Sequence, residues 1–370
     1  MQQQSAHAAV FMGSGRPLEI REYPVVPPTG GDALLSLQAS GICGTDIHIV
    51  TGRLAIPPVF IPGHEFVGRV EELGPKAQKD ALGRRLAPGD IAVACVAQAC
   101  GKCFTCRQGN TASCLQFGVT YLRDPARRPH FFGGFAEVLH HPAAGLVKLP
   151  QGVDVNAAAA FPCAGPTVIR ATAYAGGLEK DQLVVVQGTG PVGLFAIAWA
   201  AKAGCRVVAI GSSSNPRRLE LARKLGASRV LELQGSTVAD RLAEVQTMAK
   251  KLRRGNGADV VIEASGAPTA IPEGLGLLRT LGTYVIPGQY SSSGAATIQP
   301  ELITFKALRL IGSGQYTFAD IGTYLSFLRK HPDLQRLFAK CIDHRYTIAQ
   351  ANQAMDDGQQ GRFVKGIFAC

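Results

Sequence analysis

Apolar and polar positions follow two different patterns along the chain, and the change falls near residue 160. Before that point, short apolar runs are separated by turns rich in proline and glycine, and residues 33–37 and 66–70 alternate. A period of two predicts half-buried β-strands, and closely spaced turn signals are typical of a small barrel or sandwich. The first part is therefore predicted to be β-rich, with its cysteines on loops.

The second part of the chain alternates buried strands with helices. The run from Leu183 to Val186 predicts a fully buried strand, and a glycine turn and a helical segment follow it. Repeated strand–helix units predict a parallel, doubly wound sheet of the α/β class. The predicted elements are strands at 183–186, 207–210, 229–233, 259–263, 283–286 and 363–368, and helices at 191–203, 217–225, 270–281, 321–329 and 348–356.

Length and composition indicate a folded protein of about two domains. The chain has 370 residues, of which 46% are hydrophobic and 18% charged, and this excludes a disordered chain. The formal net charge is +11, but lysine and arginine are scattered and form no recognition helix or basic stripe. We interpret the charge as solvated surface, with attraction of an anionic cofactor as the alternative, and expect no nucleic-acid partner.

The start of the chain and its cysteines bear on location. The segment MQQQSAHAAVFMGSG lacks the charged start and apolar run of a signal peptide. The most apolar stretch, residues 192–201, is too short to span a bilayer. Ten cysteines without an export signal favour metal ligation or free thiols over disulfides. These features predict a cytoplasmic enzyme with no membrane partner.

A dense cysteine loop is the strongest metal signal. Residues 100–114 read CGKCFTCRQGNTASC, with two residues between the first three cysteines and seven before the last. This spacing lets four thiolates converge on one ion, and an all-thiolate zinc site is closed and structural. An iron–sulfur cluster also uses four cysteines and stays open as an alternative. The predicted ligands are Cys100, Cys103, Cys106 and Cys114.

A second set of ligand types is dispersed. Cys43 lies in GICGTDIH, His64 in PGHEFVG and Cys163 in AAFPCAGPT. Spacing cannot unite these residues, and each taken singly could be a packed side chain. The residues alone therefore leave a three-ligand site open.

The order of these motifs resembles the zinc-containing medium-chain dehydrogenase/reductase family, on the alcohol dehydrogenase side. GICGTDIH, GHEFVG, the cysteine loop, GGFAE at 133–137 and GTGPVG at 188–193 occur in the family's order, over essentially the whole chain. The resemblance implies a GroES-like, β-rich catalytic domain of residues 1–163 completed by 313–370. It also implies a Rossmann nucleotide-binding domain of residues 164–312.

The resemblance also implies a catalytic zinc ion at Cys43, His64 and Cys163, with water or substrate as the fourth ligand. With the cysteine loop, this makes two zinc ions per chain. Many polyol-type relatives carry glutamate at the third position, so Cys163 favours the alcohol dehydrogenase side. Glu65 and Asp46 adjoin the presumed ligands and are expected to orient His64 and tune charge at the metal.

Proton transfer is assigned by the same resemblance. Thr45 is expected to take the proton of the alcohol oxygen and pass it, through cofactor hydroxyls, to His48 near the surface. His140 and His141 match no motif and are expected on the surface. Tyr121, with Phe131 and Phe132, is a candidate wall of the substrate pocket.

The glycine turn predicts a nicotinamide cofactor. GTGPVG lies between a buried strand and a helix, a context in which this weak motif becomes strong. Gly188 makes the turn, Gly190 lets the pyrophosphate approach, and Gly193 lets the helix pack on the strand. Free N–H groups at the helix start face the phosphates, and proline suits its first turn. The predicted binding residues here are Gly188, Gly190, Pro191, Val192 and Gly193.

Cofactor choice depends on the end of the next strand. An acid there binds the ribose hydroxyls of NAD, but this chain has Gly211, followed by a serine-rich loop. This favours NADP, since hydroxyls and arginines suit a 2′-phosphate. Two alternatives stay open: the loop binds NAD through its hydroxyls, or it is only the start of a helix whose arginines are solvated. Lys365 aligns with a basic residue that contacts the pyrophosphate in relatives. The candidate phosphate ligands are Ser212, Ser213, Ser214, Arg217 and Arg218.

The predicted function is hydride transfer between a small alcohol, or its aldehyde or ketone, and NAD(P). Family members are usually dimers or tetramers, so we expect a homo-oligomer. One alternative is a zinc-independent enoyl or quinone reductase on the same scaffold, although such relatives generally lack both cysteine sets. The other is a non-catalytic protein that binds zinc and nucleotide.

Overall fold

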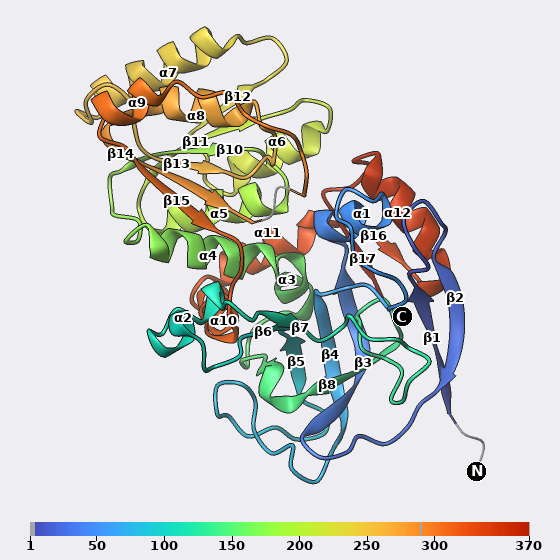
Figure 1. The fold of residues 1–370 in the computed structure, drawn as a ribbon. Coiled ribbons are helices and arrows are strands. Elements are labelled where there is room, and N and C mark those ends of the chain that lie inside the picture. The colour runs from blue at the N-terminus through green and yellow to red at the C-terminus, as the bar shows by residue number, and fades with distance from the viewer. Residues whose placement is uncertain (1–3, 289–290, 370) are drawn as a thin grey trace. The chain divides into compact units, whose positions relative to one another are not determined.

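The computed structural model describes residues 4–288 and 291–369, which form two compact units (Figure 1). The first unit comprises residues up to 166 together with those from 316 onward, and the second comprises residues 167–315. None of the helices that the structure describes has the length and apolar character needed to cross a bilayer.

The first unit is built on a seven-stranded sheet. Its strand order is β16-β17-β3-β4-β5-β9, and β8 pairs with β3. The last strand of the chain joins this sheet through antiparallel pairing of Ile367 with Gly41, so the C-terminal segment completes an N-terminal sheet. The strands are β3 (Asp32–Gly41), β4 (Phe66–Leu73), β5 (Ile91–Ala94), β8 (Val138–Pro142), β9 (Leu146–Lys148), β16 (Ile342–Tyr346) and β17 (Lys365–Phe368).

Aromatic side chains fill the core of this unit. Phe135 packs edge-on against Phe368, with ring centroids 4.6 Å apart, and Phe11 packs on Phe60 at 5.1 Å. Two short two-stranded sheets lie outside the main sheet. The remaining elements are β1 (Ser5–Val10), β2 (Glu19–Pro24), β6 (Ala97–Gln98), β7 (Gly118–Val119), α1 (Gly44–Val50), α2 (Phe104–Arg107), α3 (Val155–Ala160), α10 (Phe318–Lys330), α11 (Pro332–Cys341) and α12 (Ala351–Gln359), with 3-10 turns at Thr111–Ser113, Ala143–Gly145 and Ile348–Gln350.

The second unit is a doubly wound parallel sheet. Its order β12-β11-β10-β13-β14-β15 corresponds to 3-2-1-4-5-6 in order of appearance, so the strand order reverses between β10 and β13. In Figure 1, α7, α8 and α9 lie on one face of the sheet and α5 on the other. The elements are β10 (Leu183–Gln187), β11 (Arg206–Gly211), β12 (Arg229–Glu232), β13 (Ala258–Glu263), β14 (Leu278–Pro287), β15 (Arg309–Ser313), α4 (Ala164–Tyr174), α5 (Pro191–Lys202), α6 (Pro216–Lys224), α7 (Val238–Lys251), α8 (Ala270–Leu277) and α9 (Pro300–Phe305).

The predicted fold class is confirmed, and the differences are local. The helix predicted over 270–281 is wrong in its last turn, because α8 ends at Leu277 and residues 278–287 form strand β14, which pairs with β13. Helix α7 was not predicted, although Thr237 and Asp240 form a capping box at its start, a signal that the sequence carries. Helix α11 was also missed.

His140 and His141 are buried, so their predicted surface position is wrong. Both lie on β8, whose pairing with β3 places them opposite Leu34 and Ala33. Burial lowers the pKa of each imidazole to about 4, so both are neutral at pH 7. Adjacent residues on a strand face opposite sides of the sheet, and at β8 both sides are buried from solvent.

Candidate active site

Helix α1 positions the first predicted site residues. Cys43 is its N-cap residue, and its backbone N–H donates to the carboxylate of Asp46 at 2.9 Å. Thr45 and His48, three positions apart, lie on one face of the helix. The hydroxyl of Thr45 is 3.8 Å from Cys43 Sγ, and His48 is half-buried. Burial and the nearby Arg53 lower the pKa of His48 below its ordinary value.

Four dispersed residues converge beside this helix. One donor atom from each of Cys43, His64, Glu65 and Cys163 lies within 4.8 Å of all the others. His64 and Glu65 directly precede β4, and Cys163 follows α3. Two thiols, an imidazole and a carboxylate in a buried to half-buried group fit a zinc ion.

Asp46 is the acid that faces His64. His64 Nδ1 lies 3.3 Å from Asp46 Oδ1, and both atoms are buried without a hydrogen-bond partner among the described residues. This contact leaves Nε2 as the donor for a metal, an arrangement usual for metal-bound histidine. Burial by itself would lower the pKa of His64, but the charges of Asp46 and Cys43 outweigh it and hold that pKa well above its ordinary value.

The pKa values of Cys43 and Cys163 are shifted in opposite directions. Contact with Cys163 lowers the pKa of Cys43 well below its ordinary value, and the charges of His64 and Lys365 add to this effect. Contact with Cys43 and burial raise the pKa of Cys163. A thiolate is the form that binds metal, so the pair is electrostatically suited to a cation.

Glu65 and Lys365 lie elsewhere than predicted. The Glu65 carboxylate does not orient His64; it forms an ion pair with Lys365 and belongs to the ligand group itself. Burial raises the pKa of Glu65 to about 7, against the opposing charge of Lys365. Lys365 is fully buried and also donates to Ile42 O at 3.2 Å, so in this structure its ammonium is not available to a cofactor pyrophosphate.

Tyr121 lies beside the ligand group. Its ring stacks on His64 with centroids 6.4 Å apart and lies 5.8 Å from the ring of Phe60. Phe131 is fully buried and packs on Tyr23 at 6.0 Å, so it belongs to the core and not to a wall of the site. Of the three predicted wall residues, the structure brings Tyr121 to the predicted metal ligands.

The four cysteines of residues 100–114 also converge. Their sulfur atoms lie within 4.8 Å of one another, and β6 and β7 pair at the base of the loop through Ala97 with Val119. Backbone N–H groups of Cys100 and Gln116 donate to Cys114 Sγ at 3.2 and 3.3 Å. The hydroxyl of Thr105 and backbone N–H groups lower the pKa of Cys103 to about 5. The group fits a closed, structural zinc site.

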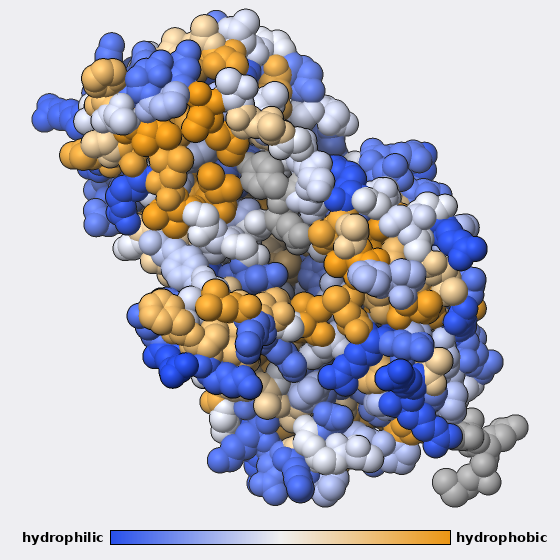
Figure 2. Space-filling model, viewed as in Figure 1, coloured by the Kyte–Doolittle hydropathy of each residue, from blue (hydrophilic) through white to orange (hydrophobic). Residues whose placement is uncertain are grey.

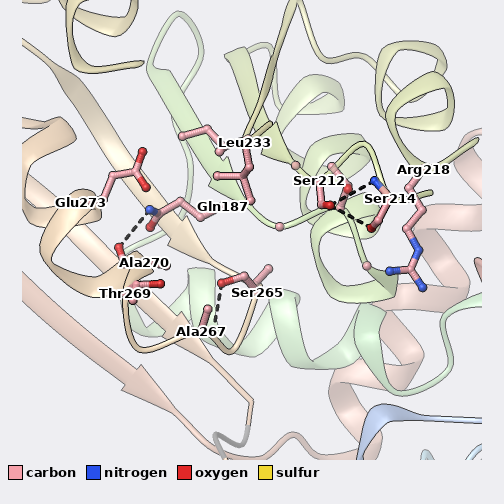
Figure 3. Close-up of a pocket in the computed structure, with 16 residues that line it drawn as sticks. Gln187, Ser212, Ser214, Arg218, Leu233, Ser265, Ala267, Thr269, Ala270 and Glu273 are labelled. Atoms are coloured by element: carbon pink, nitrogen blue, oxygen red, sulfur yellow. Dashed lines mark hydrogen bonds between the residues drawn. The ribbon is translucent and has the colours of Figure 1, made fainter. Parts of the chain in front are cut away.

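A pocket of about 290 Å³ opens at the switch point of the doubly wound sheet (Figure 3). It lies at the carboxyl ends of β10, β11 and β13, where open α/β sheets bind ligands. Gly188 takes φ +103, and a Cβ on Gly193 would lie 1.9 Å from Gly188 O, so the turn requires glycine at both positions. Nothing lies within 4 Å of a Cβ built on Gly190, which leaves room above it.

Part of the predicted phosphate-binding group lines this pocket. Ser212, Ser214 and Arg218 line one end (Figure 3), whereas Ser213 hydrogen-bonds Gln234 and does not line it. Arg217 also lies outside the lining. Pro191, Val192 and Gly193 form the first turn of α5 behind the lining residues.

The structure explains the missing acid. A Cβ on Gly211 would lie 2.6 Å from Thr189 Oγ1 and 2.8 Å from Leu219 Cδ2, so a side chain at this position would require these neighbours to shift. Thr189, the residue between the first two glycines of the turn, fills that space. The sequence motif did not reveal this contact, because it joins two different loops.

The opposite end of the pocket carries residues that the motif did not reveal. Gln187, Thr269 and Glu273 line it (Figure 3), and Glu273 is the only carboxylate among the described lining residues. These residues come from the end of β10 and the start of α8. In the sequence, Glu273 is only a polar residue inside an apolar helix, and its spacing does not indicate that it lines the pocket.

Together, the doubly wound sheet with its glycine turn and the cysteine–histidine group define a nucleotide-binding, metal-dependent oxidoreductase. Family models bear this out: residues 29–151 match the alcohol dehydrogenase GroES-like domain, and residues 191–330 match the zinc-binding dehydrogenase model. The chain belongs to the zinc-containing medium-chain dehydrogenase/reductase family, and it is an oxidoreductase of the dehydrogenase type.

Similar proteins cover the whole chain. The chain is 34% identical over 369 residues to 5-exo-hydroxycamphor dehydrogenase of Pseudomonas putida, covering 98% of both chains. An alcohol dehydrogenase structure from Thermotoga maritima is similar with TM-score 0.87 and 26% identity, covering 99% of both chains. A zinc-binding dehydrogenase structure from Sinorhizobium meliloti, bound to NADP, has TM-score 0.79 and 26% identity, covering 100% of both chains.

Proposed function

We propose that this protein is an alcohol dehydrogenase that moves a hydride between a cyclic secondary alcohol, or its ketone, and NADP. The observation that carries the proposal is the buried group of Cys43, His64 and Cys163. Zinc-independent reductases of this scaffold do not need such a ligand set. Residues 1–163 with 313–370 are proposed as the catalytic domain and residues 164–312 as the nucleotide-binding domain.

Zinc at Cys43, His64 and Cys163 would supply a Lewis acid for the oxygen of the alcohol. Thr45 Oγ1 accepts the alcohol proton as it passes on its own hydroxyl hydrogen, and His48, on the same face of α1, takes up the proton released at the end of this relay. The lowered pKa of His48 keeps its imidazole neutral at pH 7, so it can accept this proton. Asp46 fixes the orientation of His64 through the 3.3 Å contact.

A bulky, apolar substrate is proposed from two observations. Tyr121 places its ring beside His64 and packs on the fully buried Phe60, and Val96 precedes the cysteine loop. The Pseudomonas putida relative is named for a hydroxylated camphor, a rigid bicyclic alcohol. Aromatic faces gain most from large apolar partners, so a ring-bearing alcohol suits this surface better than ethanol.

NADP is proposed because Ser212, Ser214 and Arg218 offer donors to a 2′-phosphate, and Gly211 leaves no acid to repel it. Among similar solved structures, one is bound to NADP and another is complexed with NADH. The ratio of kcat/KM for NADP to that for NAD is expected to exceed about 10. A strong NAD preference would refute the phosphate site.

The main test is steady-state kinetics with a panel of cyclic and linear alcohols. We expect borneol-type and cyclohexanol-type alcohols to exceed ethanol in kcat/KM by about 10-fold or more. Zinc analysis should find two ions per chain, and Cys43→Ser should remove one ion and abolish turnover. Full activity of Cys43→Ser would refute the mechanism.

We also propose that two copies associate through the β15 edge. This strand ends the sheet, and exposed apolar side chains gather over α9 and β15 (Figure 2). Phe305 is 85% exposed and Leu281 66%, with Leu310 on the edge strand itself. An uncovered apolar edge is a site for pairing with another chain. Light scattering should find a dimer or tetramer, and Leu310→Lys should shift it toward monomer.

A further inference from the structure

An isolated ion pair lies beneath one end of the cofactor pocket. Arg241 on α7 contacts Glu273 on α8, with Nε 2.6 Å from Oε1, and both side chains are at least 92% buried from solvent, being 6% and 8% exposed. Arg241 also donates to Ser236 O at 2.7 Å. Two buried charges carry a large desolvation cost, so a pair that only joined two helices could be replaced by apolar residues.

Only one oxygen of the Glu273 carboxylate is engaged. Oε1 receives the guanidinium of Arg241, whereas Oε2 accepts no hydrogen bond from the described residues and is not among the buried polar atoms without a partner. Glu273 lines the pocket, so the surface that it retains faces that space. The carboxylate therefore presents an acceptor to a ligand there.

The side-chain amide of Gln187, which also lines this end of the pocket, is already engaged in hydrogen bonds within the protein. Gln187 Nε2 donates to Ala270 O at 3.0 Å, and Gln187 Oε1 accepts from Tyr284 Oη at 2.9 Å. A Cβ on Gly274 would lie 2.4 Å from Tyr284 Oη, so glycine is required for this arrangement. The amide of Gln187 is thus held by the protein, and the free acceptor belongs to Glu273.

The pocket has a guanidinium group at one end and the carboxylate of the Arg241–Glu273 ion pair at the other. Figure 3 shows Arg218, with Ser212 and Ser214, on one side and Glu273 on the other. Ile210, Leu233 and Ala267 line the space between them. Apolar walls between a cationic and an anionic end suit a flat ring with an anionic group at one end and a hydrogen-bond donor at the other.

We propose that Glu273 recognises the 6-amino group of the cofactor's adenine ring and that Arg241 is a positioning residue for its carboxylate. The inference rests on the proposed nicotinamide cofactor and goes beyond it, to the identity of the base. Adenine offers N–H donors at its exocyclic position, whereas hypoxanthine offers an oxygen that the carboxylate repels. A site built to bind an N–H group rejects an analogue without it.

The test compares the cofactor with its deamino analogue, nicotinamide hypoxanthine dinucleotide phosphate. A hydrogen bond to a charged group predicts that kcat/KM favours the amino form by about 10- to 100-fold. Calorimetry with AMP and IMP should show the same preference in Kd without turnover. Glu273→Gln, whose amide both donates and accepts, should reduce both ratios to about 3 or less.

Two further variants keep the test decisive. Glu244 lies on the same helix as Arg241, pairs with Arg229 of β12 and lines no part of the pocket, so Glu244→Gln should keep the full preference. Glu273→Gln leaves the buried guanidinium of Arg241 without its carboxylate, which can prevent folding. The double variant Arg241→Met with Glu273→Met replaces both charges by apolar side chains and avoids this unpaired buried charge. It should also lose the preference.

The outcomes separate this inference from the proposed function. Equal binding of AMP and IMP by the unaltered protein, or a preference that survives in Glu273→Gln, overturns the role of Glu273 even if the enzyme oxidises alcohols with NADP. A clear AMP preference that Glu273→Gln removes supports the role, even if no alcohol is oxidised, and in that case hydride transfer would be refuted.

Discussion

Gly211 offers a sharp test of how the cofactor pocket is built. Replacing it with alanine adds one Cβ, which would lie 2.6 Å from Thr189 Oγ1, 2.7 Å from Thr189 Cγ2 and 2.8 Å from Leu219 Cδ2. Thr189 is 5% exposed and Leu219 3%, so the neighbours have little room to move. The φ of Gly211 is not in the left-handed region, so the cost comes from crowding and not from the backbone.

Overpacking of this kind destabilises a core by about 1–3 kcal/mol. Two of the three close contacts are with Thr189, and Thr189→Ala removes both. The double variant Gly211→Ala with Thr189→Ala should therefore lose less stability than the sum of the single variants, by about 1–2 kcal/mol. The remaining contact, with the end of the Leu219 side chain, is the one most easily relieved.

Urea unfolding followed by the fluorescence of Trp199 is the appropriate assay. Trp199 is the single tryptophan of the chain and lies on α5, in the same unit as Gly211. A cost below about 0.5 kcal/mol for Gly211→Ala, or single-variant costs that simply add, would refute the steric argument. The same geometry predicts that Gly211→Asp impairs both cofactors, and that adding Thr189→Ala recovers activity with NAD but not NADP.

Three further changes are predicted from the described contacts. Cys103→Ser should lower zinc content by one equivalent per chain and make residues 100–114 sensitive to proteolysis. The pKa of His141 is about 4 in the folded protein, against about 6.5 in the unfolded chain. The free energy of unfolding should therefore fall by up to about 3 kcal/mol as the pH drops from 6.5 towards 4. His141→Gln should flatten this pH dependence in denaturant melts. Asp259→Asn should cost about 1–3 kcal/mol, because Asp259 holds Arg254 and Arg279, each at 2.7 Å but partly exposed.

Matched variants serve as controls. Cys205→Ser, outside both ligand groups, should keep both zinc ions. His7→Gln, which replaces an exposed histidine, is the control for His141→Gln, and Glu220→Gln should leave the denaturant melt unchanged because its ion pair with Lys224 is exposed. Unchanged zinc in Cys103→Ser, the same slope in His141→Gln or an unaltered melt of Asp259→Asn would contradict the respective prediction.

Local features of the chain were predictable because their geometry is set within a few residues. The spacing of Cys100, Cys103 and Cys106 keeps their thiols within one loop, and the structure brings them together with Cys114. The run 183–186 followed by GTGPVG indicates a strand, a turn and a helix through residues that are adjacent in the sequence. Apolar periodicity likewise identified the α/β class, since it follows from which face of each element is buried.

Long-range pairing decided the remainder. Cys43, His64 and Cys163 meet only because the sheet and α3 bring distant segments together, and from the residues alone their union stayed open. Residues 278–281, predicted as helix, belong to β14 because this strand pairs with β13. His140 and His141, predicted on the surface, are buried because β8 pairs with β3. The ion pair of Arg241 with Glu273 joins two helices whose separation along the chain carries no signal.

The sequence by itself thus determined the elements, the cysteine loop and the glycine turn, because neighbouring residues constrain one another through the backbone. Only the tertiary structure decided that Lys365 pairs with Glu65 instead of reaching a cofactor, that Thr189 closes the space at Gly211, and which carboxylate faces the pocket. These are contacts between elements, and their geometry depends on how whole layers pack.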